Sequence, residues 1–304
     1  MSSNAFRTGA ALGLTMSLAA APAVGGRAAP VVDHEAEVRA WHKDRIARLT
    51  SETGWLTVVG LFWLKEGENT FGSAAGNDLV FPGRAPARMG RFTLKGDNVT
   101  LTLESGVTVT LGDKPFTGGA VRTDAQGGPD VLKHGSLMFN LIQRGPKVGV
   151  RLKDSESEAR KAFKGIETYP VRREWRVEAR WEPHKEPRKI PVSNVIGMTE
   201  PMDAPGVAVF TVGGKEYRLE PVIEEPGANE LFFIFADETS RTETYGAGRF
   251  LYTSLPRDGK LTIDFNKAYN PPCAFTKYAT CPLPPPQNRL ALRVEAGEKR
   301  YGDH

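Results

Sequence analysis

The spacing of hydrophobic residues predicts a chain built mostly from short β-strands. In the stretch "NVTLTLE", Val99, Leu101 and Leu103 alternate with polar residues, which is the period of a half-buried strand. Similar runs recur between residues 55 and 299, and breaks such as "GDN" and "ESG" are typical of hairpin turns. Because strands do not alternate with helices along the chain, we predict a mainly β fold of antiparallel sheets that form a sandwich or a barrel.

One segment near the N-terminus has helical spacing instead. Four apolar residues fall on one face of a helix, and they are Val38, Trp41, Ile46 and Leu49. Asp33 is a residue type that caps the start of a helix. We therefore predict an N-terminal amphipathic helix from about Glu35 to Leu49.

Prolines and charges interrupt the strand pattern at residues 182–191, in the stretch "EPHKEPRKIP". Such composition is typical of a boundary between compact parts of a chain. We predict that this segment separates two β-rich halves.

The first 29 residues have the pattern of a secretory signal peptide. One positive charge, Arg7, precedes an apolar run from Ala10 to Val24 that is followed by small residues. The run is too short and too rich in Ala and Gly for a membrane span, which needs about 20 strongly apolar residues. We expect cleavage between Ala21 and Ala29, no transmembrane segment in the mature chain, and a periplasmic or secreted product.

The composition is that of an ordinary globular protein. The 304 residues are 40% hydrophobic and 25% charged, and the formal net charge is +4. Basic and acidic residues are interspersed, whereas a nucleic-acid partner would require a concentrated basic stripe, so none is expected. The sequence lacks the P-loop, the dinucleotide fingerprint, the Gly-x-Ser-x-Gly elbow and the His-Glu-x-x-His motif. We therefore expect no cofactor and no metal ion.

Three stretches carry a resemblance to a known family. They are "GWLTVVGLFWLKEGENTFGS", "ELFFIFADETSRTETYGAGRFLY" and "DFNKAYNPPCAFTKYATCPLPPPQNRL". Together they resemble the domain-of-unknown-function family 1684 of bacteria and archaea, over a length from about Ala36 to Tyr301. The resemblance implies that residues 30–304 form one family domain, and it implies no activity and no catalytic residue.

The chain's two cysteines, Cys273 and Cys281, lie eight residues apart. In an exported protein, two cysteines and no others favour a disulfide. Closing so small a loop stabilises the fold by about 2–3 kcal/mol in the chain-entropy model. Two alternatives stay open: a pair of inert buried thiols, or a metal-binding or nucleophilic site, for which the segment lacks the histidines that would complete a zinc site.

Polar and aromatic residues gather around this cysteine segment. The candidate ligand-binding residues are Glu243, Tyr245, Arg249, Asp264, Asn266, Tyr269, Asn270 and Arg289. The prolines at positions 271–272 and 284–286 hold the chain extended beside them, and Gly246 and Gly248 permit a tight turn or a close approach of the backbone. If the preceding strands pair, these side chains converge at one end of a sheet, where an Arg beside an acid is either a structural ion pair or an anion clamp.

Three functions are consistent with this cluster. The first is binding of a small or extended ligand, such as an envelope-derived molecule, at the cluster. The second is a hydrolase in which Asp264 or Glu243 is the general base and Arg249 or Arg289 stabilises an anion. The third is a structural or partner-binding envelope protein without a pocket.

Overall fold

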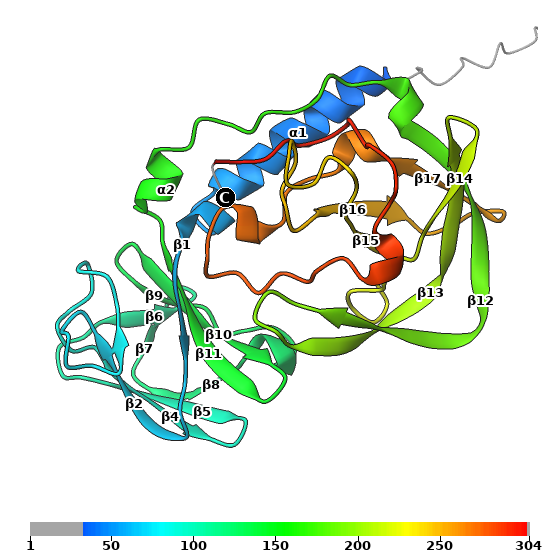
Figure 1. The fold of residues 1–304 in the computed structure, drawn as a ribbon. Coiled ribbons are helices and arrows are strands. Elements are labelled where there is room, and N and C mark those ends of the chain that lie inside the picture. The colour runs from blue at the N-terminus through cyan, green and yellow to red at the C-terminus, as the bar shows by residue number, and fades with distance from the viewer. Residues whose placement is uncertain (1–32, 303–304) are drawn as a thin grey trace, which may run out of the picture. The chain divides into compact units, whose positions relative to one another are not determined.

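The computed structural model describes residues 33–302, which contain one long helix and 17 β-strands (Figure 1). The expected signal peptide, residues 1–29, lies outside the described residues. No helix of the described part is long and apolar enough to cross a membrane. The mainly β prediction is confirmed, and every strand pair is antiparallel except β2 with β3 (β2 Gly67–Gly72, β3 Leu79–Val80).

The predicted helix is confirmed as α1 (His34–Thr50). Buried residues recur at helical spacing along one face of α1, but this face is not purely apolar. The residues buried on it are His34, Val38, Arg45 and Leu49. The His34 imidazole and the Arg45 guanidinium make hydrogen bonds to residues far along the chain, so polar contacts as well as apolar packing hold the helix.

Two sheets enclose the first hydrophobic core. One has the strand order β1-β11-β10-β9-β6-β7 and the other β3-β2-β4-β5-β8. The strands not yet given are β1 (Val58–Trp63), β4 (Gly90–Lys95), β5 (Asn98–Leu103), β6 (Val109–Leu111), β7 (Lys114–Phe116), β8 (Gly119–Val121), β9 (Leu132–His134), β10 (Leu137–Arg144) and β11 (Lys147–Asp154). Phe71 and Phe92 from one sheet pack against Phe139 from the other. This arrangement is a sandwich, in which the alternation predicted for β5 buries Val99 and Leu101.

The remaining strands build a second β-rich part. They are β12 (Arg176–Ser193), β13 (Thr199–Val212), β14 (Lys215–Leu219), β15 (Glu230–Phe235), β16 (Arg249–Ser254) and β17 (Lys260–Asp264). One sheet has the order β14-β13-β12-β17, and β15 and β16 form a separate two-stranded ribbon. Phe233 and Phe235 belong to one core and Phe232 and Ile234 to another. Because residues 231–235 of β15 are buried on both faces, this part of the strand is continuously apolar instead of alternating.

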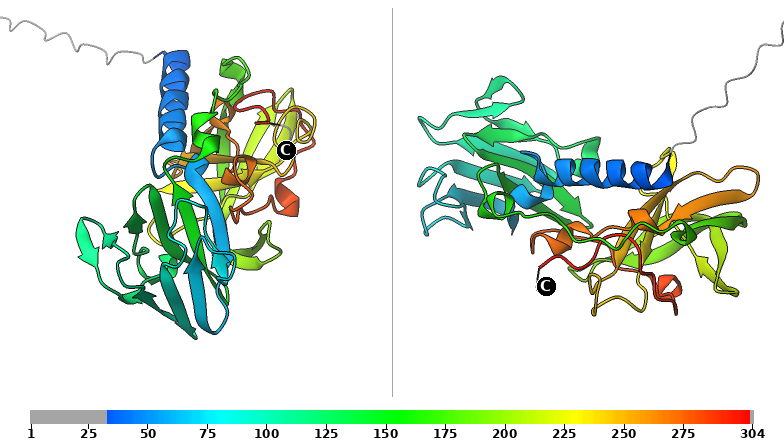
Figure 2. Two further views of the ribbon diagram at one scale, coloured as in Figure 1. Left: turned by 90° about the vertical axis from the view of Figure 1, so that its left-hand side faces the viewer. Right: turned by 90° about the horizontal axis from the view of Figure 1, so that it is seen from above.

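Short helical segments connect these strands. They are α2 (Glu158–Lys161) and the 3-10 helices Trp55–Thr57, Asp124–Gln126, Arg173–Trp175, Phe265–Lys267, Pro272–Ala274 and Pro286–Asn288. Figure 2 shows α1 along its length; in the left-hand view the second β-rich part lies to one side of the helix and the first sandwich lies below its lower end.

The boundary predicted at residues 182–191 lies inside β12, and the change from one core to the next occurs earlier, between β11 and β12. The pairing of β12 with β13 shifts register between Pro183 and Arg188. On its other side β12 pairs with β17 only over residues 176–180. The later prolines therefore sit at an edge or a bulge, where a missing amide proton leaves no partner unsatisfied.

Candidate functional site

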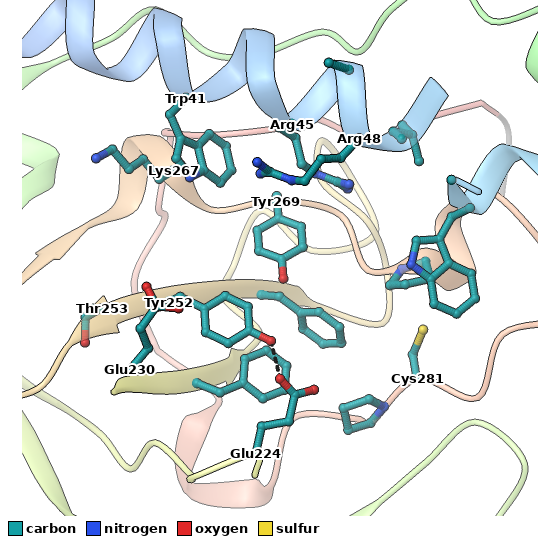
Figure 3. A pocket seen from close by; sticks show the side chains of 18 of the residues that line it. Trp41, Arg45, Arg48, Glu224, Glu230, Tyr252, Thr253, Lys267, Tyr269 and Cys281 are labelled. Atoms are coloured by element: carbon teal, nitrogen blue, oxygen red, sulfur yellow. Dashed lines mark hydrogen bonds between the residues drawn. The ribbon is translucent and has the colours of Figure 1, made fainter. Parts of the chain in front are cut away.

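A cavity of about 1320 Å³ lies between α1, the β15–β16 ribbon and the segment from Tyr269 to Pro282 (Figure 3). Arg144 and Arg151 of the first sandwich line the far side. Widely separated regions of the sequence therefore supply its walls.

Six aromatic rings line the cavity, and they are Trp41, Trp55, Phe232, Phe250, Tyr252 and Tyr269. Phe232 and Tyr252 face each other across the β15–β16 ladder, with ring centroids 4.7 Å apart. The ring centroids of Tyr269 and of Trp41 on α1 lie 6.0 Å apart. All of these rings except Trp55 contact one another, and together they form a continuous aromatic wall that carries two phenol hydroxyls.

The phenols of Tyr252 and Tyr269 are neutral hydrogen-bonding groups. Tyr252 donates to a carboxylate oxygen of Glu224 over 2.6 Å, as Figure 3 shows. Burial raises the pKa of both tyrosines, so neither ionises near neutral pH. The Arg45 guanidinium lies 4.7 Å from the centre of the Tyr269 ring and fixes it from the α1 side.

Most charged groups on the wall are paired. Glu37 forms ion pairs with Lys267 at 2.5 Å and with Arg176 at 3.1 Å. The hydrogen bond from Lys267 lowers the pKa of Glu37. Arg45 pairs with Glu298 at 3.3 Å and donates to the Asn270 carbonyl at 2.9 Å. Burial raises the pKa of Glu298. These pairs compensate most of the charge at the α1 side of the cavity, where Arg48 is a lining cation without an ion pair among the described residues.

The far wall is different because two guanidiniums lie there close to one carboxylate. Arg144 pairs with Asp124 at 2.7 Å and donates to the Thr280 hydroxyl at 3.2 Å. Arg151 is only 8% exposed, yet among residues 33–302 it has no ion pair, and its Nε and Nη2 atoms have no hydrogen-bond partner. It lies 5.0 Å from the Trp55 ring centre. Burial, followed by repulsion from Arg144, lowers the pKa of Arg151 to about 10, so it stays cationic at neutral pH.

Of the eight sequence-predicted ligand-binding residues, the structure places Asp264 and Tyr269 on the cavity wall. Asp264 accepts hydrogen bonds from His34 at 2.8 Å and from the side chain of Asn266 at 2.8 Å. Asn266 and Asn270 are buried and hold neighbouring backbone: Asn266 binds the amide and carbonyl of Arg172, and Asn270 binds the carbonyl of residue 299. They position the segment around Tyr269 without facing the cavity.

The other four predicted residues lie outside the cavity lining. Arg249 is 1% exposed and bonds Asp237 at 2.6 Å and two backbone carbonyls, so it is the structural ion pair of the two alternatives. Glu243 pairs with Arg293 and accepts from the Tyr169 hydroxyl. Tyr245 is half-buried, and burial raises its pKa to about 12. Arg289 is exposed.

The C-terminal half of the chain matches a known protein family. Residues 161–299 match the family model described as "Protein of unknown function (DUF1684)". The chain belongs to this family. The matched range covers β12 to β17 and is narrower than the expected range from Ala36 to Tyr301, because the first sandwich lies outside it.

The DUF1684 protein is also similar to a solved structure, the solution NMR structure of an uncharacterized protein of Haloarcula marismortui. The two chains are 30% identical over 48% of this chain and 81% of that one, with a TM-score of 0.41. A search of curated proteins finds no match.

The two cysteines of this DUF1684 protein lie side by side but unbonded. Cys281 is buried on the cavity wall, and its sulfur accepts the backbone amide of Cys273 at 3.2 Å. A hydrogen bond with the Cys273 thiol, followed by burial, raises the pKa of Cys281. The disulfide stays a prediction, and the described residues contain no group of three or more His, Cys, Asp or Glu side chains placed to hold a metal ion.

Sequence reasoning missed the groups that α1 and the first sandwich bring to the cavity. Trp41, Arg45 and Arg48 recur at helical spacing and all line it, which is a signal that the helix presents them together. Arg151 carries no such signal. It alternates with Val150 and Leu152 in β11, which is the pattern of a strand whose polar face meets water.

Proposed function

We propose that this DUF1684 protein is an exported protein that binds a small organic molecule in the cavity between α1 and the β15–β16 ribbon. The observation that carries the proposal is the cavity itself, with a volume of about 1320 Å³ and six aromatic rings on its wall. Ligand sites are concave and largely apolar, with a few placed polar groups, and typically enclose about 300–1,000 Å³. At about 1320 Å³ the cavity exceeds this range, and its wall combines aromatic rings with charged side chains, so it accommodates an organic molecule that has both apolar and polar groups.

Export is proposed on the signal-peptide pattern of residues 1–29. An oxidising compartment would join Cys273 to Cys281, whose backbone amide and sulfur are already in contact. We expect no titratable thiol in unfolded, unreduced protein purified from the periplasm, and two thiols after reduction. Two thiols without reduction would contradict the disulfide.

A hydrolase that uses the predicted cluster has less support. Of its two proposed bases, Asp264 lies on the cavity wall and Glu243 does not. Its proposed anion stabilisers are a fully engaged Arg249 and an exposed Arg289, neither of which lines the cavity. A structural protein without a pocket is also less favoured, because a large cavity with aromatic walls is present.

The test is binding of N-phenyl-1-naphthylamine, a neutral aromatic probe that fluoresces in apolar surroundings. Ala47 is an exposed residue of α1 at the cavity, so Ala47→Trp obstructs the cavity without changing a core. Ala40→Trp places the same side chain on the exposed part of α1 that does not line the cavity. We expect saturable 1:1 binding in the parent protein and in Ala40→Trp, and its loss in Ala47→Trp. Absence of binding, or equal binding in both variants, would contradict the proposal.

A further inference from the structure

We propose that the ligand of this cavity is an organic anion whose charged group binds at Arg151 and whose apolar body lies along the aromatic wall. This inference rests on the proposed function and adds the chemical class and the orientation of the ligand. The carrying observation is the Arg151 guanidinium on the cavity wall, which is more than nine-tenths buried, packs against the Trp55 ring, and has no carboxylate and no side-chain hydrogen-bond partner among the described residues.

Burying a charge without a partner is costly, because the low-dielectric interior replaces water without supplying hydrogen bonds. Proteins keep buried charges mainly as pairs, as this chain does with Arg249 and Asp237. Arg151 departs from that rule, and one of its sides faces a cavity. A bound anion would compensate the charge that the fold leaves uncompensated.

The charged groups around Arg151 also favour an anion. Arg144 and Lys153 are cationic neighbours, and Lys153 is engaged by the Thr53 carbonyl at 2.6 Å. Asp124 is a nearby carboxylate, and it forms its ion pair with Arg144. Three cations with one carboxylate leave a net positive charge at this end, where the Thr280 hydroxyl and the buried Cys281 are among the polar groups of the wall.

The opposite end of the cavity sets the orientation. There Glu37, Glu230 and Asp264 line the wall together with Lys267 and Arg176, so acids outnumber bases at that end, whereas Arg45 and Arg48 of α1 lie between the two ends in Figure 3. An anionic group at that end would meet repulsion that it would not meet at Arg151. Figure 3 shows Tyr252 and Tyr269 between Lys267 on one side and Cys281 on the other, so the rings lie between the two ends.

The experiment compares two probes that share one aromatic body. 1-Anilinonaphthalene-8-sulfonate differs from N-phenyl-1-naphthylamine by its sulfonate group alone. We expect the parent protein to bind the sulfonate at least about tenfold more tightly than the neutral probe, the strength of a charged hydrogen bond, and to lose this preference as salt is added. A parent protein that binds the neutral probe equally well or better would overturn the inference, whether or not a variant folds.

Arg151→Met then locates the anion. We expect about tenfold weaker binding of the sulfonate and a change within about twofold for the neutral probe. Arg91→Met is the matched control, because it removes the same charge from a surface pair of β4 away from the cavity. Equal effects of the two variants on the sulfonate, or equal weakening of both probes by Arg151→Met, would overturn the assignment to Arg151. Failure of both probes to bind the parent protein would instead reject the proposed function.

Discussion

Two arginines show how differently a buried charge can be used in this fold. Arg249 is enclosed by Asp237 and by the carbonyls of Val294 and Ala296, and it closes the end of β16 against the C-terminal segment. Arg151 is nearly as buried, but it faces a cavity and its only charge-compensating contact among the described residues is the face of the Trp55 ring. The first arginine serves the stability of the fold, and the second is kept at a cost that a bound anion would offset.

The stabilising role of Arg249 is open to direct measurement. Arg249→Met leaves Asp237 buried without its cation, so we expect the free energy of unfolding to fall by about 3–5 kcal/mol. Urea denaturation measures this change. Arg91→Met, which breaks an exposed pair with Glu68, should cost less than about 1 kcal/mol. A loss in Arg249→Met no larger than in the control would contradict the structural role.

His42 links the stability of the protein to pH. Its Nε2 bonds the Asn266 carbonyl at 3.0 Å, and burial lowers its pKa, with smaller contributions from Arg45 and Lys267. Between the lowered pKa and the usual value of about 6.5, the unfolded chain binds a proton that the folded protein does not. The stability due to neutral His42 is therefore complete above about pH 6.5 and is lost as the pH falls toward the folded pKa.

The measurement is urea denaturation at about pH 7.5 and about pH 5.5. His42→Gln keeps a side-chain donor for the Asn266 carbonyl and removes the titration. We expect the parent protein to lose more stability than His42→Gln between the two pH values. An identical loss in both would show that His42 does not contribute to the pH dependence.

At the scale of elements, the alternation of side chains along β16 decides which predicted residues reach the cavity. Arg249 shares a face with Leu251, which packs into the core, whereas Phe250 and Tyr252 point to the other face and line the cavity. The sequence predicted the strand and the close approach of its glycine turn. It did not reveal which face of the strand would meet a cavity, because both faces are covered by other parts of the chain.

The turn before β16 supplies an element-scale prediction. Gly248 has a φ of 99°, and a Cβ there would lie 2.5 Å from the Phe235 carbonyl oxygen and 2.6 Å from Pro284. Gly248→Ala therefore combines an unfavourable backbone angle with a clash against β15, and we expect a loss of about 3 kcal/mol or more in urea denaturation. Gly213→Ala is the control, because its φ is 58° and nothing lies within 4 Å of the added atom, so about 1 kcal/mol is expected. Equal losses would contradict the close approach.

For the whole molecule, local sequence patterns predicted the fold class but not the cavity. Helix α1, the mainly β architecture and the hairpins follow from spacings of two to four residues, which a single sequence displays. The cavity joins residues 37, 151, 224 and 269, whose proximity depends on tertiary packing. Of the predicted ligand-binding residues, only Asp264 and Tyr269 line it, and both lie near the cysteine segment, whose composition of prolines, aromatic residues and amides is visible in the sequence.

The central claim is that this DUF1684 protein holds an organic anion with its charge at Arg151 and its body against the aromatic wall. A crystal structure of the protein with 1-anilinonaphthalene-8-sulfonate tests it most directly. We predict the naphthalene rings beside Tyr252 and Tyr269, with the sulfonate in contact with Arg151. A probe found outside the cavity, or inside it with the sulfonate toward Lys267, would contradict the account.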